Sequence, residues 1–313
     1  MEQLQHEVEE PTANTTVVRT EPATVALESA EPRAAAVTPQ ACSTCGPAPA
    51  VGTGLATSAS WVYALGNVEV RFPSISVEKE FAQATGRDKT SGLTDRQVLH
   101  TMLSKPENRY LVRQLCYVMT VEGMETYLLL PRDPADFDLL VEAVRPNPSP
   151  LDMDVVIGAK GPIAPPQMCN GLMIPLVAFD QIYSFDRDTL IKSIPKPDKT
   201  SAKEFAPVAE EIFDRITQLT DNAGATDEHR ALNYCAVRYQ AIYAKAAEYY
   251  AANNSLTAVD VQPSSLSSTR NVVEVIFSYT NRNTDVVDKC FVRVDVTDEF
   301  PFLVTKLSPY YDR

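Results

Sequence analysis

Residues 272–296, VVEVIFSYTNRNTDVVDKCFVRVDV, decide the fold class of the second half of the chain. Apolar side chains recur at every second position on both sides of the polar segment 281–285, as they do in two half-buried strands. The segment between them carries asparagine and aspartate, which favour a reversal of the chain. The sequence therefore predicts an antiparallel hairpin with strands over about 271–279 and 287–296.

Two helices are predicted before this hairpin, over about 203–220 and 226–252, and Thr226 is expected to cap the second. The second helix carries apolar residues at helical spacing, which indicates a face turned toward a core. Two further strands flank the hairpin, at about 256–261 and 302–307. Helices followed by an antiparallel meander predict an α+β fold.

The preceding residues predict a mixed α/β half. An apolar stretch near its start predicts two strands joined by a turn at Gly66, and residues 111–130 predict a hairpin that turns at Glu122-Gly123. Buried strands are expected at 154–157 and 172–179. Helix-start patterns occur at Ser74, Thr94 and Asp133.

The composition divides the chain into three predicted regions. Residues 1–60 hold seven acidic residues, two basic residues, six prolines and no aromatic residue, so we expect a disordered acidic tail. A boundary at Pro195–Thr200 then separates two predicted domains, 61–197 and 198–313.

The charge excludes several classes of function. With 41 acidic and 28 basic residues the net charge is −13, which disfavours nucleic acid as a partner. No apolar run approaches the roughly eighteen residues that span a bilayer, and the start of the chain has no secretory pattern. We therefore expect a cytoplasmic protein with no membrane partner, whose six cysteines are mostly reduced.

The pair Cys42 and Cys45 has the spacing of half a tetrahedral zinc site. The same pair also fits a redox couple or two free thiols. A second copy of the chain would complete a zinc site of four thiolates and give a zinc-linked homodimer. Within one chain, the missing ligands would come from a histidine or from the remaining cysteines, Cys116, Cys169, Cys235 and Cys290.

Cys169 is a candidate nucleophile, because it lies on a proline-rich loop before a predicted strand. Catalysis would require a histidine within hydrogen-bond reach. The predicted body contains only His100 and His229, both of which we expect to be surface or half-buried residues. The other three cysteines of the body lie on apolar faces and are predicted to be small core residues.

Two regions are candidates for binding a peptide or a protein partner. Arg109 and Arg113 are four residues apart, so a helix would place both guanidinium groups on one face, where they could grip a carboxylate or form ordinary salt bridges. The loop residues Met168, Cys169 and Asn170 form the second region.

Long blocks of the body resemble the C-terminal domain of the PatG-type cyanobactin maturation proteases. The blocks are WVYALG at 61–66, RFPS at 71–74, SVEKEFAQATGR at 76–87, GLTDRQ at 92–97, PRDPADFDLL at 131–140, the stretch 161–173, and the end of the chain from Phe277 to Arg313. The resemblance covers 61–313, and members of this family also tend to carry a Cys-x-x-Cys pair just upstream.

The resemblance implies a role in making ribosomally produced, post-translationally modified peptides. In that family the chemistry belongs to a subtilisin-like macrocyclase and, in some members, to a flavin oxidase, and neither module is present in this sequence. We therefore expect a stand-alone, non-catalytic accessory protein that binds precursor peptide or maturation enzymes. The alternatives are a small peptide-modifying enzyme centred on Cys169 or a metal, and a zinc-linked structural dimer.

Overall fold

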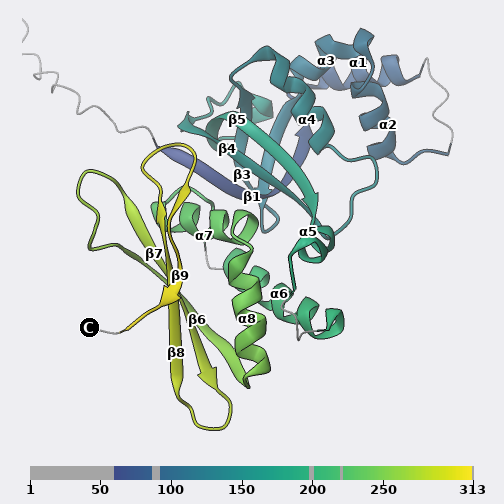
Figure 1. Cartoon of the computed structure of the whole chain (residues 1–313). Helices are drawn as coiled ribbons and strands as arrows, with labels where there is room; N and C mark the ends of the chain where they lie inside the picture. Colours follow the sequence, from purple (N-terminus) through teal and green to yellow (C-terminus); the bar gives the residue numbers. More distant parts are fainter. Residues whose placement is uncertain (1–59, 87–91, 197–200, 219–220, 312–313) are drawn as a thin grey trace, which may run out of the picture. The chain divides into compact units, whose positions relative to one another are not determined.

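The computed structural model describes residues 60–86, 92–196, 201–218 and 221–311. The predicted disordered tail, including Cys42 and Cys45, lies outside these residues except for Ser60. The described part of the chain has an α+β fold, as predicted, with one closed sheet and one open sheet (Figure 1). None of its helices is long and apolar enough to cross a bilayer.

Five strands close into a barrel in the order β1-β2-β3-β5-β4. All neighbouring pairs are antiparallel except β3 and β5, which run parallel. Buried side chains from all five strands fill the interior. The strands are β1 Trp61–Arg71, β2 Cys116–Val121, β3 Met124–Pro131, β4 Asp152–Ile163 and β5 Pro175–Asp186.

The predicted turn at Gly66 is wrong, because β1 runs through this residue without interruption. Residues 61–66 of β1 pair with β4, whereas 67–71 pair with β2. Gly66 lies where the strand passes from one partner to the other, and a Cβ atom there would be 2.0 Å from the carbonyl oxygen of Thr120. The glycine is therefore needed for close approach of two strands, not for a reversal of the chain.

Short helices connect the strands of the barrel, and the last of the short helices, α5 (Arg187–Ser193), packs against α6 (Ala202–Thr217) of the second half. The predicted caps are confirmed: the side chains of Ser74, Thr94 and Asp133 accept hydrogen bonds from the first turns that follow them. The predicted hairpin is confirmed as β2 and β3, but its first residues, from Leu111 to Gln114, belong to a helix. The helices are α1 Ile75–Thr85, α2 Asp95–Leu103, η1 Pro106–Asn108, α3 Arg109–Gln114, η2 Pro134–Asp136, α4 Phe137–Ala143, η3 Cys169–Gly171 and α5 Arg187–Ser193.

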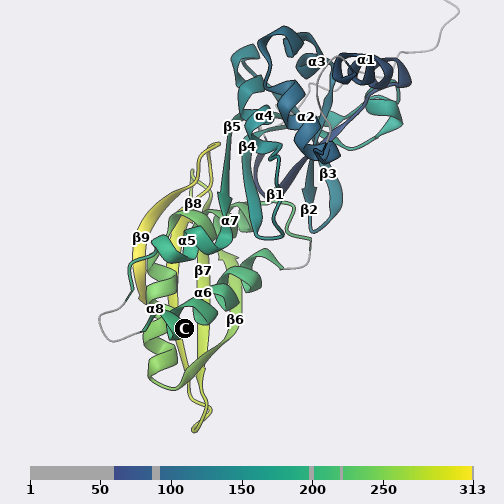
Figure 2. The same ribbon diagram turned by 90° about the vertical axis from the view of Figure 1, so that its right-hand side faces the viewer.

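The described part of the second half contains three helices and a four-stranded antiparallel sheet in the order β6-β7-β8-β9, which confirms the predicted meander. The helices lie against one face of this sheet (Figure 2), and their buried residues share a hydrophobic core with it. The elements are α6 Ala202–Thr217, α7 Asp227–Arg238, α8 Ala241–Ala251, β6 Asn254–Pro263, β7 Val272–Asn281, β8 Val287–Asp295 and β9 Phe302–Pro309.

The single helix predicted over 226–252 is wrong in one respect, since it is divided into α7 and α8. Thr226 caps α7 as predicted. The chain leaves helical geometry at Tyr239, whose φ and ψ are −111° and 82°. The Tyr239 hydroxyl accepts a hydrogen bond from the Leu307 amide of β9 at 2.9 Å, so the break lets this ring reach the edge of the sheet.

One hydrophobic core contains residues from both sides of the predicted boundary near residue 197. Tyr63 and Leu65, on the outer face of β1, lie in the same buried cluster as α6, α7 and the inner face of the second sheet. Asn233 of α7, which is fully buried, donates to the Tyr63 carbonyl at 2.8 Å. The division into domains 61–197 and 198–313 stays a prediction.

Candidate binding sites

A pocket with a volume of about 260 Å³ lies where β2 begins and β3 ends. The last residue pair that β2 and β3 share at this end is Tyr117 with Leu129. Beyond it, Cys116 pairs only with Arg71 of β1, and Leu130 pairs with Ala178 of β5. The two strands therefore separate here, and the pocket opens between them.

We refer to this site as the barrel-end pocket. Its walls are mostly apolar, and Arg113 is the only charged residue among the described residues that line it. The lining residues come from the segment after β1, from α3 and the residue after it, from β2, β3 and α4, and from the loop before β5. They are Pro73, Arg113, Gln114, Leu115, Cys116, Tyr117, Leu128, Leu129, Leu130, Pro131, Phe137, Gln167, Met168 and Cys169.

A disulfide bond joins Cys116 and Cys169 in the wall of this pocket. Their Cα atoms are 5.9 Å apart, within the usual range for such a bond. The expectation of reduced cysteines is therefore wrong for this pair, and Cys169 has no free thiol in this structure. Sequence reasoning missed the bond because 53 positions separate the two residues.

Only some residues of the two predicted peptide-contact regions lie together in one pocket. Arg113, Met168 and Cys169 line the barrel-end pocket, whereas Arg109 and Asn170 do not. Cys169 and Asn170 both have positive φ, at 49° and 56°, so the loop passes through an uncommon conformation at two consecutive residues that are not glycine. Asn170 is exposed, and Met168 is half-buried.

Arg109 and Arg113 both lie on α3, which meets the condition that their spacing set for sharing a helix face, but their environments differ. Arg109 donates to a carboxylate oxygen of Asp138 at 2.8 Å, which is the ordinary salt bridge considered from sequence. Arg113 is exposed, and within the described residues no carboxylate lies in ion-pair distance of its guanidinium group. The pocket therefore has an unpaired positive charge at its rim.

The comparisons with known proteins agree with this fold. Residues 199–310 match the PatG C-terminal family. The PatG resemblance predicted from sequence is thereby confirmed. The fold is also similar to a solved structure described as a PatG domain of unknown function, with a TM-score of 0.66 and 16% sequence identity. That likeness covers 80% of this chain and 99% of the other. No curated protein matches.

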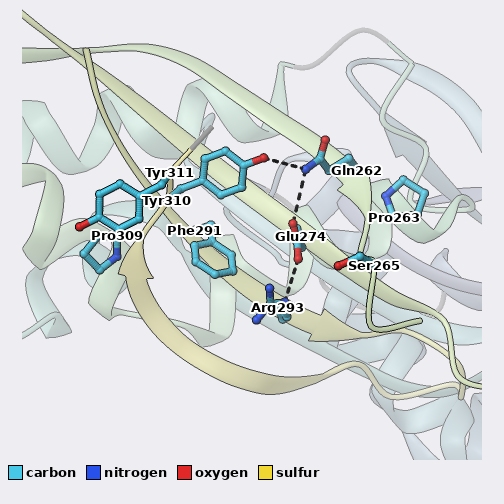
Figure 3. A pocket seen from close by; sticks show the side chains of 9 residues that line it. All are labelled: Gln262, Pro263, Ser265, Glu274, Phe291, Arg293, Pro309, Tyr310 and Tyr311. Carbon is cyan, nitrogen blue, oxygen red and sulfur yellow. Dashed lines mark hydrogen bonds and ion pairs between the residues drawn. The ribbon is translucent and has the colours of Figure 1, made fainter. Parts of the chain in front are cut away.

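The region that matches the PatG C-terminal family contains most of a larger pocket, of about 590 Å³, on the face of the second sheet opposite the helices (Figure 3). Gln262 donates to the Tyr310 hydroxyl and to Glu274, and Glu274 pairs with Arg293 at 2.8 Å. Arg293 in turn lies over the ring of Phe291. Because these polar groups bind one another, they leave little unsatisfied chemistry for a ligand.

A third pocket, of about 200 Å³, which we call the junction pocket, draws residues from the barrel and from the PatG C-terminal match. It is lined by Tyr63, Ile157, Gln181, Tyr183, Tyr234, Arg238, Phe300 and Pro301. Sequence reasoning missed it. The one local signal was a basic residue, Arg238, directly after the apolar stripe of α7.

The remaining candidates from sequence do not form a site. His100 and His229 are half-buried, as expected, and burial lowers the pKa of His229. Cys235 and Cys290 are buried free thiols, and their burial raises both pKa values to about 12, so they are inert core residues as predicted. The residues that the structure describes contain no cluster of three or more potential metal ligands.

Proposed function

We propose that this protein is a non-catalytic accessory protein that binds an extended segment of a precursor peptide in the barrel-end pocket. An apolar side chain of the peptide occupies the pocket, and a neighbouring acidic residue pairs with Arg113. The resemblance to PatG-type maturation proteins supports a modified peptide pathway as the setting. Binding holds the peptide close to enzymes that carry out the chemistry, which raises its local concentration without a reaction at this site.

One observation carries the proposal: an apolar pocket and an unpaired guanidinium group lie together. A volume of about 260 Å³ is below the roughly 300–1,000 Å³ of sites for drug-sized ligands, so it suits one large side chain better than a cofactor. Met168 adds a flexible and polarizable wall, which adapts to different apolar groups.

Charge complementarity favours an acidic partner residue. The protein as a whole is strongly acidic, with a net charge of −13, so it repels anionic peptides at long range. An exposed arginine with no carboxylate partner is a local exception to that repulsion. It selects peptides in which a single acid is correctly placed beside the apolar anchor, because a guanidinium group binds a carboxylate in a fixed geometry.

The test is a fluorescence anisotropy titration with the full chain. The probe is a labelled synthetic peptide of about twelve residues that carries one leucine flanked by glutamates. We expect a dissociation constant in the micromolar range, typical of a small, transient contact. Arg113→Gln should weaken binding about three- to tenfold, or about 0.7–1.4 kcal/mol. Met168→Ala should weaken it by a similar factor through lost packing.

Arg109→Gln is the matched control, because it removes the same charge from the same helix at a residue outside the pocket. Its affinity should stay within about twofold of the wild type. Equal losses in both arginine variants would contradict the proposal, since they would indicate a diffuse electrostatic attraction. Equal binding of a peptide with glycine in place of leucine would contradict the role of the pocket.

Mass spectrometry of the peptide before and after incubation separates an accessory protein from an enzyme. The proposal predicts an unchanged mass. A change in mass that requires Cys169 in its reduced form would favour the peptide-modifying enzyme instead.

A further inference from the structure

The junction pocket is rich in hydrogen-bond donors. The hydroxyls of Tyr63 and Tyr183 are 2.6 Å apart, and either can donate to the other. Whichever donates, the second hydroxyl keeps a proton that it can offer to a third group. Tyr234 supplies another hydroxyl, and Gln181 is exposed at the pocket and supplies an amide.

These hydroxyls remain protonated donors at neutral pH. Burial raises the pKa of Tyr63, and the neighbouring Tyr183 adds to this effect, while Arg238 opposes it. Burial likewise raises the pKa of Tyr183 and of Tyr234, again against the influence of Arg238. The positive charge of Arg238 therefore reaches all three rings.

Among the residues that the structure describes, no carboxylate lies in ion-pair distance of Arg238, and no acidic residue lines the pocket. The guanidinium carbon of Arg238 lies 5.8 Å from the centre of the Tyr183 ring. Among the described arginines, only four lack a carboxylate in ion-pair distance, and two of these, Arg96 and Arg282, donate to other oxygens of the protein. The remaining two are Arg113 and Arg238, and each lines a pocket.

The pocket favours a singly charged anion over a phosphate dianion. Arg238 is the last residue of α7, where the helix dipole places partial negative charge, so only about one net positive charge is available. A planar guanidinium group matches a carboxylate in a bidentate geometry. The other walls, including Ile157, Phe300 and Pro301, are apolar and suit a hydrocarbon or aromatic group.

We infer that the junction pocket binds a carboxylate carried on an aromatic or apolar group. Arg238 pairs with the carboxylate, and the hydroxyl pair of Tyr63 and Tyr183 donates a hydrogen bond to it. The volume of about 200 Å³ limits the ligand to a small organic acid or to the carboxyl terminus of a peptide. The inference does not rest on the proposed function, because it concerns a different pocket.

The experiment is isothermal titration calorimetry of the full chain with four probes, one of which is inorganic phosphate. Phenylacetate represents a free acid, N-acetylphenylalanine represents a peptide terminus, and phenylacetamide is the neutral isostere. We expect at least one acid to bind with a submillimolar dissociation constant and the amide to bind at least about tenfold more weakly. Binding of the first acid alone would identify a free acid, and binding of the second alone would identify a chain terminus.

Variants of the lining residues test whether the acid binds in the junction pocket. Arg238→Gln should weaken binding of the acid at least about tenfold, and Tyr183→Phe should weaken it about three- to tenfold. Arg109→Gln is the control, because Arg109 lines neither this pocket nor the barrel-end pocket, and it should leave the affinity for the acid within about twofold of the wild type. The inference is overturned if neither acid binds below about 10 mM, if the amide binds as well as the acid, if Arg238→Gln has no effect, or if inorganic phosphate binds more tightly than either carboxylate.

Discussion

Reduction of the Cys116–Cys169 disulfide should destabilise the protein substantially. The bond closes a loop over 53 positions, and the loss of that constraint from the unfolded chain corresponds to about 4 kcal/mol at 25 °C. Measured values are often lower than this entropic estimate, so we expect a loss of about 2–4 kcal/mol. In urea, with a slope of about 3 kcal/mol per molar, the unfolding midpoint should fall by about 1 M.

Reduction of the disulfide should also loosen the loop 164–174 locally. The backbone hydrogen bonds of the loop 164–174 join residues of the loop to one another, such as Ala164 to Ile174 at 2.9 Å and Met168 to Pro165 at 2.9 Å. The disulfide adds a covalent link from this loop to the start of β2. Hydrogen exchange in the loop should therefore speed up on reduction more than exchange in β7, at the centre of the second sheet.

The assay compares the oxidised protein, the protein treated with a dithiol reductant, and the variant Cys116→Ser with Cys169→Ser. In the reduction, one dithiol donates two electrons and two protons, and becomes a cyclic disulfide while both protein thiols form. The reduced protein and the double variant should unfold at similar urea concentrations, and the reductant should not affect the variant further. Differential alkylation should show both cysteines protected before reduction. Free thiols at both positions, or equal midpoints before and after reduction, would refute the reasoning.

Three further outcomes are expected. Gly66→Ala should cost more than about 3 kcal/mol in a urea titration, because its Cβ would meet a backbone carbonyl of β2 at 2.0 Å, whereas Gly161→Ala, with 3.4 Å to its nearest neighbour, should cost far less. Burial and the neighbouring Asp180 carboxyl raise the pKa of Glu299 to about 7. This folded-state pKa lies above the ordinary value of 4.5. The contribution of Glu299 to the free energy of unfolding is therefore complete below about pH 4.5 and is lost as the pH rises through about 7. Between pH 5 and 8 the wild type should lose about 2 kcal/mol, allowing for solvent screening, and Glu299→Gln should lose clearly less; an equal loss would assign the pH dependence elsewhere. Metal analysis of the full chain should find zinc in the wild type and none in the variant that carries both Cys42→Ser and Cys45→Ser. A metal-free wild type would contradict the predicted zinc half-site.

Local patterns in the sequence predicted local structure well. The alternation around the turn 281–285 gave the central hairpin of the second sheet, and the capping box at Thr94 gave the start of α2. These features depend on hydrogen bonds and side-chain directions within a few residues, or across one short turn. The spacing of Arg109 and Arg113 fitted one helix face only if that segment was helical, and the alternation that predicted a hairpin over 111–130 did not show that residues 111–114 belong to α3.

Features that depend on distant residues could not be predicted in this way. The barrel closes through the parallel pairing of β3 with β5, which joins Leu128 to Leu176, and no local pattern specifies that contact. Gly66 was interpreted as a turn because glycine favours both reversals and close backbone contacts, and only the neighbouring strand distinguishes them. The difference between Arg109 and Arg113 likewise depends on Asp138, which the fold brings to one arginine and not to the other.

A charge-swap titration tests peptide binding at the barrel-end pocket most directly. Two proteins, the wild type and Arg113→Glu, are each titrated with two peptides. Both peptides carry the central leucine, and it is flanked by glutamates in one and by lysines in the other. The account predicts that the wild type prefers the glutamate peptide, that Arg113→Glu prefers the lysine peptide, and that the coupling between the two changes is about 1 kcal/mol or more. Additive effects of the two changes, or no binding of the glutamate peptide to the wild type, would contradict it.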